Sequence, residues 1–164
     1  MIIRDAVEGD IPVITDIFNS VIDSSNSVYR EERVPQSERL EWLRDKRSNG
    51  YPIIVVEQDG IVVAYGGFGS FRAAQGYRLT VEHTIHVAEA YRKRGIGRAI
   101  LSELITRAKE GGYHLMIGAI DSENVGSIML HEDFGFAECA RIKDAALKHG
   151  KYLTLVLMEK NLNE

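Results

Sequence analysis

Some segments of the chain repeat apolar residues at helical spacing, and others have the apolar pattern of strands. Segments of the two kinds alternate along the chain, which predicts a mixed α/β fold. Residues 1–7 indicate a short strand, whereas residues 10–22 repeat apolar side chains at helical spacing after an aspartate that can cap the helix. A polar loop over residues 24–35 follows. A second helix is expected from a serine cap at residue 37 to Gly50, which ends the run.

The middle of the chain is rich in β-branched residues and predicts strands. Residues 53–56 and 61–64 flank an Asp-Gly pair, which is typical of a hairpin turn, and extended chain continues to about residue 71. The segment 78–87, RLTVEHTIHV, predicts a further strand, in which successive side chains, Glu82 among them, point to alternate faces.

The remaining elements complete a single domain over residues 1–164. We expect a helix at about 98–110, a strand at 114–120, a short helix between 121 and 135, and antiparallel strands at 136–142 and 152–158. The order is βααβββαβαββ, an α/β fold with a mixed, mostly antiparallel sheet flanked by helices. We expect one parallel strand pair, around the connection that contains two glycines.

The segment Tyr91–Ile100, YRKRGIGRAI, combines the features of an anion site. Three basic residues and two glycines lead into a helical pattern, and these residues are Arg92, Lys93, Arg94, Gly95 and Gly97. The first N–H groups of a helix have no partner within it, and the helix dipole is positive there. A phosphate group is therefore favoured at such a junction.

Two common phosphate loops do not fit this segment. A Walker loop requires Lys and then Ser or Thr after its last glycine, but Arg98 and Ala99 follow Gly97. The dinucleotide fingerprint requires a third glycine, which the segment lacks. A tight connection between a strand and a helix can have the same glycine spacing without binding a ligand. The spacing alone therefore leaves open whether the segment is an anion site or only a turn.

Composition narrows the class of ligand. Because 24 acidic and 20 basic residues give a net charge of −4, the basic segment is a local patch that suits a small anion better than a nucleic acid. The single cysteine, Cys139, excludes an internal disulfide, and the histidine spacing predicts no metal site. With no signal-like N-terminus and no apolar stretch of about 20 residues, we expect a cytoplasmic protein that does not associate with membranes.

Three further segments accompany the glycine turn: TVEHTIHV at Thr80–Val87, SENVGSIMLHEDFGF at Ser122–Phe136 and KHGKY at Lys148–Tyr152. With them the whole chain resembles the GCN5-related N-acetyltransferases (GNAT family), and within that family the phosphinothricin and methionine sulfoximine acetyltransferases. The resemblance implies the GNAT fold, acetyl-CoA as co-substrate and a homodimer. It also implies acetyl transfer to the α-amine of a small amino acid, such as phosphinothricin, methionine sulfoximine or methionine sulfone.

Glu82 is the candidate general base for this reaction. Amide formation from a thioester needs a neutral amine, and a carboxylate on the strand before the turn could accept the ammonium proton directly or through water. Burial would raise the pKa of Glu82 toward a useful range. A solvated or ion-paired carboxylate is the alternative for a glutamate on a strand, and the resemblance of TVEHT favours the base.

The resemblance also implies which residues hold acetyl-CoA. The strand backbone runs beside the pantetheine arm, the turn holds the pyrophosphate, and Asn124, which could equally be a helix cap, contacts the pantetheine amides with support from Ser127. The full set of cofactor candidates is Thr84, Ile85, His86, Val87, Arg92, Lys93, Arg94, Gly95, Ile96, Gly97, Arg98, Asn124 and Ser127.

The proton donor for the coenzyme A thiolate has no clear candidate. Many relatives place a tyrosine on the short helix, but this chain has Leu130 and His131 there. His131 is one candidate and a packing or capping role is its alternative. Water could also supply the proton, because the thiolate is a tolerable leaving group.

The acceptor is expected to meet positively charged and amide groups, since an arginine fork matches a carboxylate or phosphinate. Substrate-binding candidates are Tyr29, Arg30, Phe71, Arg72, Gly76, Tyr77 and Arg78. Phe71 and His86 stand where relatives often carry tryptophan and tyrosine, which leaves the exact substrate open. The turn at residues 148–152 could reach the pocket of its own subunit or that of a partner.

Two other functions compete with amino-acid acetylation. A polyamine, an aminoglycoside or a protein N-terminus could be the acceptor, although a cationic acceptor would need an acidic cleft, and Arg30, Arg72 and Arg78 suit an anionic one. The chain could also be a coenzyme A-binding module without catalysis, in which case Glu82 would be dispensable.

Overall fold

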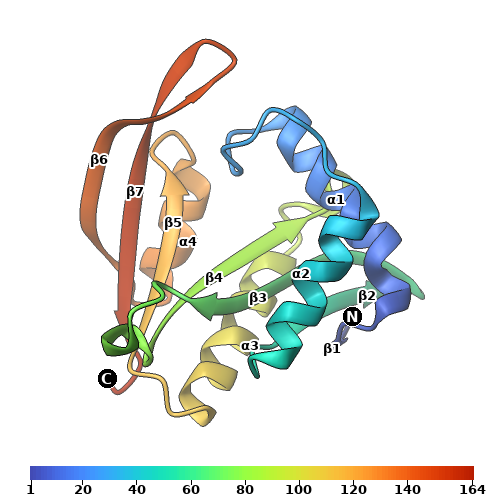
Figure 1. The fold of residues 1–164 in the computed structure, drawn as a ribbon, viewed down its shortest axis with the longest axis horizontal. Helices are drawn as coiled ribbons and strands as arrows, with labels where there is room; N and C mark the ends of the chain where they lie inside the picture. The colour runs from blue at the N-terminus through green and yellow to red at the C-terminus, as the bar shows by residue number, and fades with distance from the viewer.

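The computed structural model describes residues 1–164 and contains one seven-stranded sheet with helices on both faces (Figure 1). The helices are α1 (Ile11–Ser24), α2 (Gln36–Ser48), α3 (Ile96–Glu110) and α4 (Val125–Asp133). The strands are β1 (Ile2–Asp5), β2 (Ile53–Gln58), β3 (Ile61–Ser70), β4 (Thr80–Val87), β5 (Leu115–Asp121), β6 (Ala137–Lys148) and β7 (Lys151–Asn161).

The strand order is β1-β2-β3-β4-β5-β7-β6, and every neighbouring pair is antiparallel except β4 and β5. The parallel pair is joined through the glycine turn and α3, as the sequence predicts. It is paired only from Thr80 to His83 on β4 and from Leu115 to Gly118 on β5. Beyond those residues the two strands diverge, which Figure 1 shows, and their facing edges have no strand partner.

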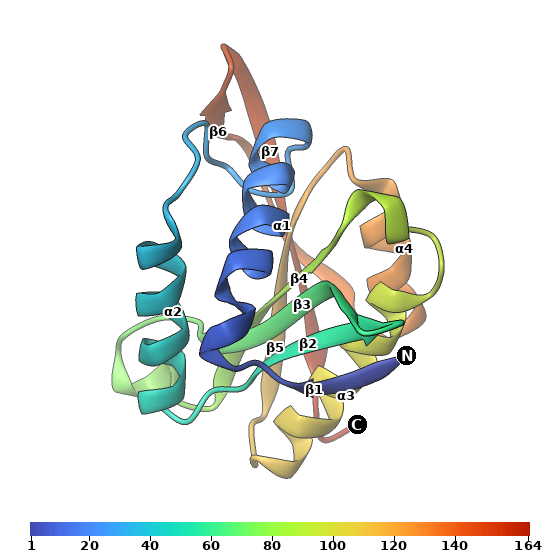
Figure 2. The same cartoon turned by 90° about the vertical axis from the view of Figure 1, so that its right-hand side faces the viewer.

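The helices form two layers, with α1 and α2 on one face of the sheet and α3 and α4 on the other (Figure 2). Alternation along β2 explains the two cores: Ile53 and Val55 pack against α1 and α2, while Ile54 and Val56 pack against α3. Each layer therefore buries its own apolar side chains, and the sheet separates them.

The predicted order βααβββαβαββ is confirmed, and the differences lie at element ends. The stretches around 61–64 and up to residue 71 form one strand, β3. Helix α3 begins at Ile96, two residues earlier than expected, because Gly95 adopts a left-handed φ of 82° that ends the turn. No helix of the structure is long and apolar enough to cross a membrane.

The C-terminal hairpin is longer than its sequence pattern indicates. β6 and β7 extend to a tip at His149 and Gly150, and they project beyond the rest of the sheet (Figures 1 and 2). Most β6 side chains are exposed, so the strand carries no alternation of buried and exposed residues that would reveal its length.

Candidate functional site

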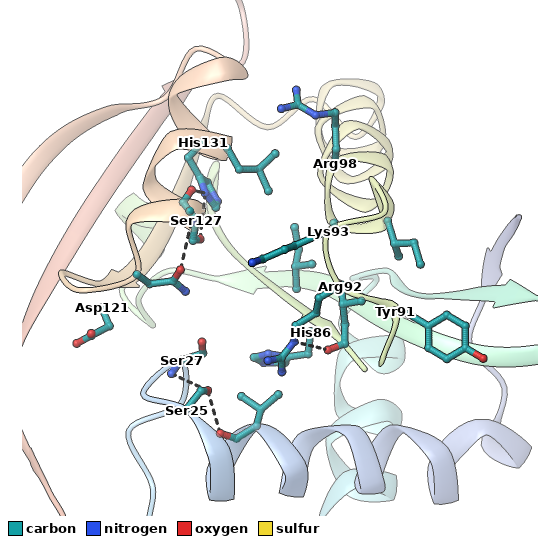
Figure 3. Close-up of a pocket in the computed structure, with 18 of the residues that line it drawn as sticks. Ser25, Ser27, His86, Tyr91, Arg92, Lys93, Arg98, Asp121, Ser127 and His131 are labelled. Carbon is teal, nitrogen blue, oxygen red and sulfur yellow. Dashed lines mark hydrogen bonds between the residues drawn. The ribbon is translucent and has the colours of Figure 1, made fainter. Parts of the chain in front are cut away.

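A cavity of about 660 Å³ lies where β4 and β5 diverge (Figure 3). Its walls come from four places: the end of α1 with the loop after it, the end of β4, the glycine turn with the start of α3, and the end of β5 with α4. The lining residues are Val21, Ser25, Asn26, Ser27, Ile85, His86, Val87, Tyr91, Arg92, Lys93, Gly95, Ile96, Gly97, Arg98, Asp121, Glu123, Asn124, Gly126, Ser127, Leu130 and His131.

This lining combines residues from both helix layers. The end of α1 and its loop lie on one face of the sheet, whereas α3 and α4 lie on the other. The cavity therefore passes through the sheet at the gap between β4 and β5. Two ligands that enter from opposite faces would meet beside the unpaired edge of β4.

The glycine turn presents a row of free backbone donors to this cavity. The N–H groups of Lys93 through Arg98 donate no hydrogen bond within the chain, and the first helical bond of α3 runs from Ala99 N–H to Gly95 O at 3.1 Å. Lys93 and Gly95 have φ values of 60° and 82°, and such alternation turns consecutive N–H groups toward one side. The turn is therefore built as an anion-binding concavity at a helix N-terminus.

The basic side chains of the turn have different surroundings. The Nε of Arg92 donates to the Val87 carbonyl at 3.2 Å, and Lys93 points into the cavity (Figure 3). Arg98 is paired with Asp133 at 2.7 Å at the rim. Arg94 lies over the ring of Tyr91, with its guanidinium carbon 5.2 Å from the ring centre, and does not line the cavity.

The end of β4 offers main-chain groups to an extended ligand. Ile85, His86 and Val87 line the cavity, and on the β5 side they have no strand partner, so a pantetheine-like chain could hydrogen-bond along this edge. Thr84 belongs to the same unpaired edge but does not line the cavity. Burial, followed by the charges of Arg39 and Arg92, lowers the pKa of His86 to about 4 and keeps its ring neutral.

Asn124 has the predicted cap geometry at the start of α4. Its side-chain oxygen accepts a hydrogen bond from the Ser127 N–H at 3.2 Å, and both residues line the cavity. The amide nitrogen of Asn124 takes no part in the cap. Capping and ligand binding are therefore compatible for this residue.

His131 is tied into a buried histidine pair. Its Nδ1 lies 2.6 Å from the Ser127 carbonyl oxygen and its Nε2 lies 3.0 Å from Nε2 of His83. Because a carbonyl oxygen can only accept, Nδ1 of His131 carries the proton and donates it to Ser127, and Nε2 of His131 accepts from the Nε2–H of His83. Burial lowers the pKa of both rings, that of His83 to about 3. Because both nitrogens of His131 are engaged, the structure favours packing over proton donation for this residue.

Glu82 is half-buried on β4, on the strand face that carries His86, and it does not itself line the cavity. Burial raises the pKa of its carboxyl group, and the charge of Lys46 opposes this rise. Opposite Glu82 in the sheet lies Gly69, where a Cβ atom would meet the Lys46 ammonium group. Lys46, from α2, is thus a neighbour of the candidate base that the sequence alone did not single out.

The substrate candidates form two groups, and none of them lines the cavity. Phe71, Arg72 and Tyr77 cluster in the exposed β3–β4 connection, with ring centres of Phe71 and Tyr77 5.8 Å apart and Arg72 stacked on Phe71. Gly76 and Arg78 belong to the same connection, where the Arg78 guanidinium donates to the Gln75 carbonyl.

The other two candidates lie on the α1–α2 loop and are already paired. Arg30 forms an exposed ion pair with Glu38 at 2.7 Å. The Tyr29 hydroxyl donates to Asp121 at 2.6 Å, and burial, with this bond, raises the pKa of the hydroxyl. Tyr29 therefore links the loop to the end of β5.

Sequence reasoning missed Asp121 and the loop residues Ser25, Asn26 and Ser27 as parts of the cavity wall. Asp121 is buried at the carboxyl end of a parallel strand, a place where ligands commonly bind, so its position carried a usable signal. The loop residues carry no such signal, because their placement depends on contacts with the distant C-terminal hairpin.

Residues 14–136 match the sequence model of the acetyltransferase (GNAT) family, and the chain belongs to this family. The L-methionine sulfoximine/L-methionine sulfone acetyltransferase of Salmonella typhimurium is 37% identical over 164 residues, which cover 100% of this chain and 96% of the relative. The expected GNAT fold is thereby confirmed, as is the resemblance on which it was based.

Two solved structures show the same fold over nearly the whole chain. That of a ribosomal-protein-alanine N-acetyltransferase from Brucella melitensis has a TM-score of 0.97 and 37% identity, with 98% of this chain and 99% of that chain covered. That of a phosphinothricin acetyltransferase from Sinorhizobium meliloti in complex with AcCoA has a TM-score of 0.94 and 32% identity, with 98% and 87% covered.

Proposed function

We propose that the protein transfers the acetyl group of acetyl-CoA to the α-amine of a small amino acid such as methionine sulfoximine, methionine sulfone or phosphinothricin. The observation that carries the proposal is the cavity through the sheet, with the free N–H groups of the glycine turn on the α3 side and a wall from α1 and its loop on the other side. The Salmonella and Sinorhizobium relatives, whose names specify these amino acids, support the choice of acceptor.

Acetyl-CoA binds from the α3 face in this proposal. The free N–H groups at residues 93–98 and the charge of Lys93 hold the pyrophosphate, and the unpaired edge of β4 at residues 85–87 holds the pantetheine arm. The thioester then lies in the gap between β4 and β5, where a backbone N–H of β4 polarises its carbonyl oxygen.

The acceptor enters from the α1 face, and Glu82 serves as general base. Glu82 lies three residues before Ile85, about 10 Å along an extended strand, so a water molecule relays the ammonium proton to it. The neutral amine attacks the thioester carbonyl carbon and the C–S bond breaks. The attacking nitrogen releases its second proton to water, and water returns a proton to the thiolate, so that the amide and free coenzyme A are formed. Arg72 and Arg78 beside the start of β4 attract the acceptor's carboxylate.

A peptide N-terminus is the second candidate acceptor. The Brucella relative, named for acetylation of a ribosomal-protein alanine, supports this alternative. Both candidates present an α-amine, but a peptide lacks the adjacent free carboxylate. Arg72 and Arg78 therefore favour the free amino acid, and removal of both charges would weaken binding of an amino acid more than that of a peptide.

The location and the assembly belong to the same proposal. The cytoplasm is where acetyl-CoA is available as a metabolite, and a homodimer would cover the unpaired edge of β6 together with exposed apolar side chains at Ile142, Leu147 and Tyr152. Light scattering on the purified protein should give twice the mass of the chain. A monomeric mass at micromolar concentration would contradict the dimer.

The test of the proposed function is a panel of amines assayed for release of the coenzyme A thiol from acetyl-CoA. The panel contains methionine sulfoximine, methionine sulfone, phosphinothricin, an alanine-initiated peptide, spermidine and an aminoglycoside. We expect the three amino acids to stimulate release most. The proposal fails if no amine stimulates release, and faster release with the peptide would favour the second candidate.

A further inference from the structure

Lys148, at the end of β6, has its ammonium group almost completely enclosed. The residue is 3% exposed, and Nζ donates to the carbonyl oxygens of Ile22 at 2.9 Å, Ser25 at 2.7 Å and Val28 at 2.8 Å. An ammonium group has three N–H donors and no acceptor, so all its donors are satisfied by backbone oxygens of one segment.

The three acceptors follow the chain out of α1. Ile22 lies in the last turn of that helix, where carbonyl groups have no helical partner and the helix dipole is negative, so a cation is favoured. Ser25 and Val28 lie in the loop that comes next. Lys148 therefore fixes the direction in which the loop leaves α1, although 120 or more residues separate it from these acceptors in the sequence.

The segment that Lys148 holds is a wall of the cavity. Ser25, Asn26 and Ser27 line it, and Figure 3 shows Ser25 and Ser27 across the cavity from Ser127. This wall comes from the α1 face of the sheet. The groups expected to hold acetyl-CoA lie instead on β4, on the glycine turn and on α4, and Lys148 contacts none of them.

Two further contacts join the same loop to the C-terminal part of the chain. The Tyr29 hydroxyl donates to Asp121 at 2.6 Å and lies 3.2 Å from the Thr154 carbonyl oxygen, and the His149 N–H donates to Glu31 at 2.6 Å. Both are more exposed than the Lys148 ammonium, so Lys148 is the buried point of this attachment.

We propose that Lys148 is a positioning residue for the acceptor: it holds the loop of residues 25–28 against the C-terminal hairpin and so shapes the acceptor side of the cavity. The inference rests on the proposed function for its kinetic readout. Lys148 touches neither ligand and acts through the loop alone.

Lys148→Met tests this, because it keeps a long side chain but removes all three donors. Lys143→Met, an exposed lysine of the same strand, is the matched control. We expect Lys148→Met to raise the KM for the amino acid about tenfold, with the KM for acetyl-CoA unchanged within about twofold. Backbone N–H groups of residues 25–29 should exchange faster with solvent than in the control.

A purely structural role would give a different result. If Lys148 only stabilised the fold, Lys148→Met would lower the active fraction and kcat and leave both KM values unchanged. That outcome would overturn the proposal, and so would an equal rise of both KM values. If Lys148→Met does not fold, Lys148→Gln retains two donors and should show the same split between the KM values, though smaller.

Failure of the proposed function is distinguishable from failure of this inference. If the wild-type protein acetylates no amino acid, the proposed function fails, while hydrogen exchange still shows whether Lys148 holds the loop. If the wild type is active and Lys148→Met leaves the amino-acid KM and the loop exchange unchanged, only the role of Lys148 is wrong.

Discussion

The two sides of the cavity are built in different ways. The α3 side uses backbone groups of residues that are consecutive in the sequence, the turn 92–98 and the strand end before it. The α1 side depends on side chains that reach across the chain, such as Lys148 to Ile22 and Tyr29 to Asp121. A site made from local backbone tolerates many side-chain changes, whereas a site made from distant side-chain contacts can be altered by one substitution outside it.

Glu82→Gln should have the largest effect, because it removes the proposed general base. Loss of a general base typically costs about a hundredfold or more in rate, so kcat should fall by that order while acetyl-CoA affinity stays similar. The measurement is steady-state kinetics together with calorimetric binding of acetyl-CoA. Unchanged turnover would remove Glu82 from the role of base.

The pH dependence of the wild type sharpens the same prediction. Burial raises the pKa of Glu82, so the carboxyl group takes up a proton at a higher pH than an ordinary glutamate does. Only the ionised form accepts a proton, so kcat should fall as the pH is lowered, with a midpoint above the ordinary value of 4.5. Glu82→Gln should lack this acidic limb.

Gly97→Val tests whether the α3 side acts through its backbone. A Cβ atom at Gly97 would meet only Leu130 at 3.8 Å and Val87 at 4.0 Å, so the fold accommodates a side chain there, but the ligand loses access to the N–H groups. We expect the KM for acetyl-CoA to rise about tenfold, because loss of one charge-assisted hydrogen bond weakens binding by about that factor. The melting temperature should change little.

Gly95→Ala is the contrasting variant. Gly95 has a φ of 82°, so an alanine there is strained and should destabilise the fold by about 1 kcal/mol. Thermal unfolding separates the two glycines. A large stability loss for Gly97→Val would contradict the assignment of that position to ligand access.

Asn124→Ala should have a smaller, mixed effect. It removes the cap on the Ser127 N–H, which should lower the free energy of unfolding by about 1 kcal/mol. If the free amide nitrogen also binds the pantetheine arm, the KM for acetyl-CoA rises a few-fold as well. Asn124→Asp, which keeps the cap oxygen, separates these roles: retained stability with weakened acetyl-CoA binding is the expected result.

The smallest effect on activity is expected at the buried histidine pair, where the change is one of acid stability. The pKa of His83 is about 3 in the folded protein, whereas an unfolded histidine titrates near 6.5. Between these values the unfolded chain binds more protons, so the free energy of unfolding should decrease as pH falls below about 6.5.

His83→Leu should make this decrease shallower between about pH 6 and pH 4. His114→Leu, at an exposed histidine, is the control and should leave the slope unchanged. Denaturant unfolding at several pH values measures both. Equal slopes for the wild type and His83→Leu would show that the buried ring does not contribute.

The contrast between the two sides also explains what the sequence could predict. The order of elements and the parallel pair depend on local periodicity along the chain. The turn depends on glycine conformation and a helix start, and both are visible in the residues around Gly95. The cap at Asn124 is local in the same way. The family resemblance is the basis for the proposed role of Glu82, which spacing alone could not indicate.

The α1 side of the cavity was less predictable because its contacts join residues far apart in the chain. Nothing near Lys148 indicates that its side chain ends at α1, and nothing near Glu82 indicates that Lys46 lies beside it. Charge is the basis only for the arginines among the substrate candidates, and the structure places Arg30 in an ion pair with Glu38 and the Phe71–Arg72 cluster outside the cavity lining.

The most direct test of the central claim is a competition between acceptors in one reaction. Acetyl-CoA is limiting, methionine sulfone and spermidine are present at equal concentration, and the products are separated and quantified by mass spectrometry. We expect N-acetylmethionine sulfone as the main product, modified at its α-amine. Acetylspermidine as the main product, or no acetylated amine at all, would contradict the central claim.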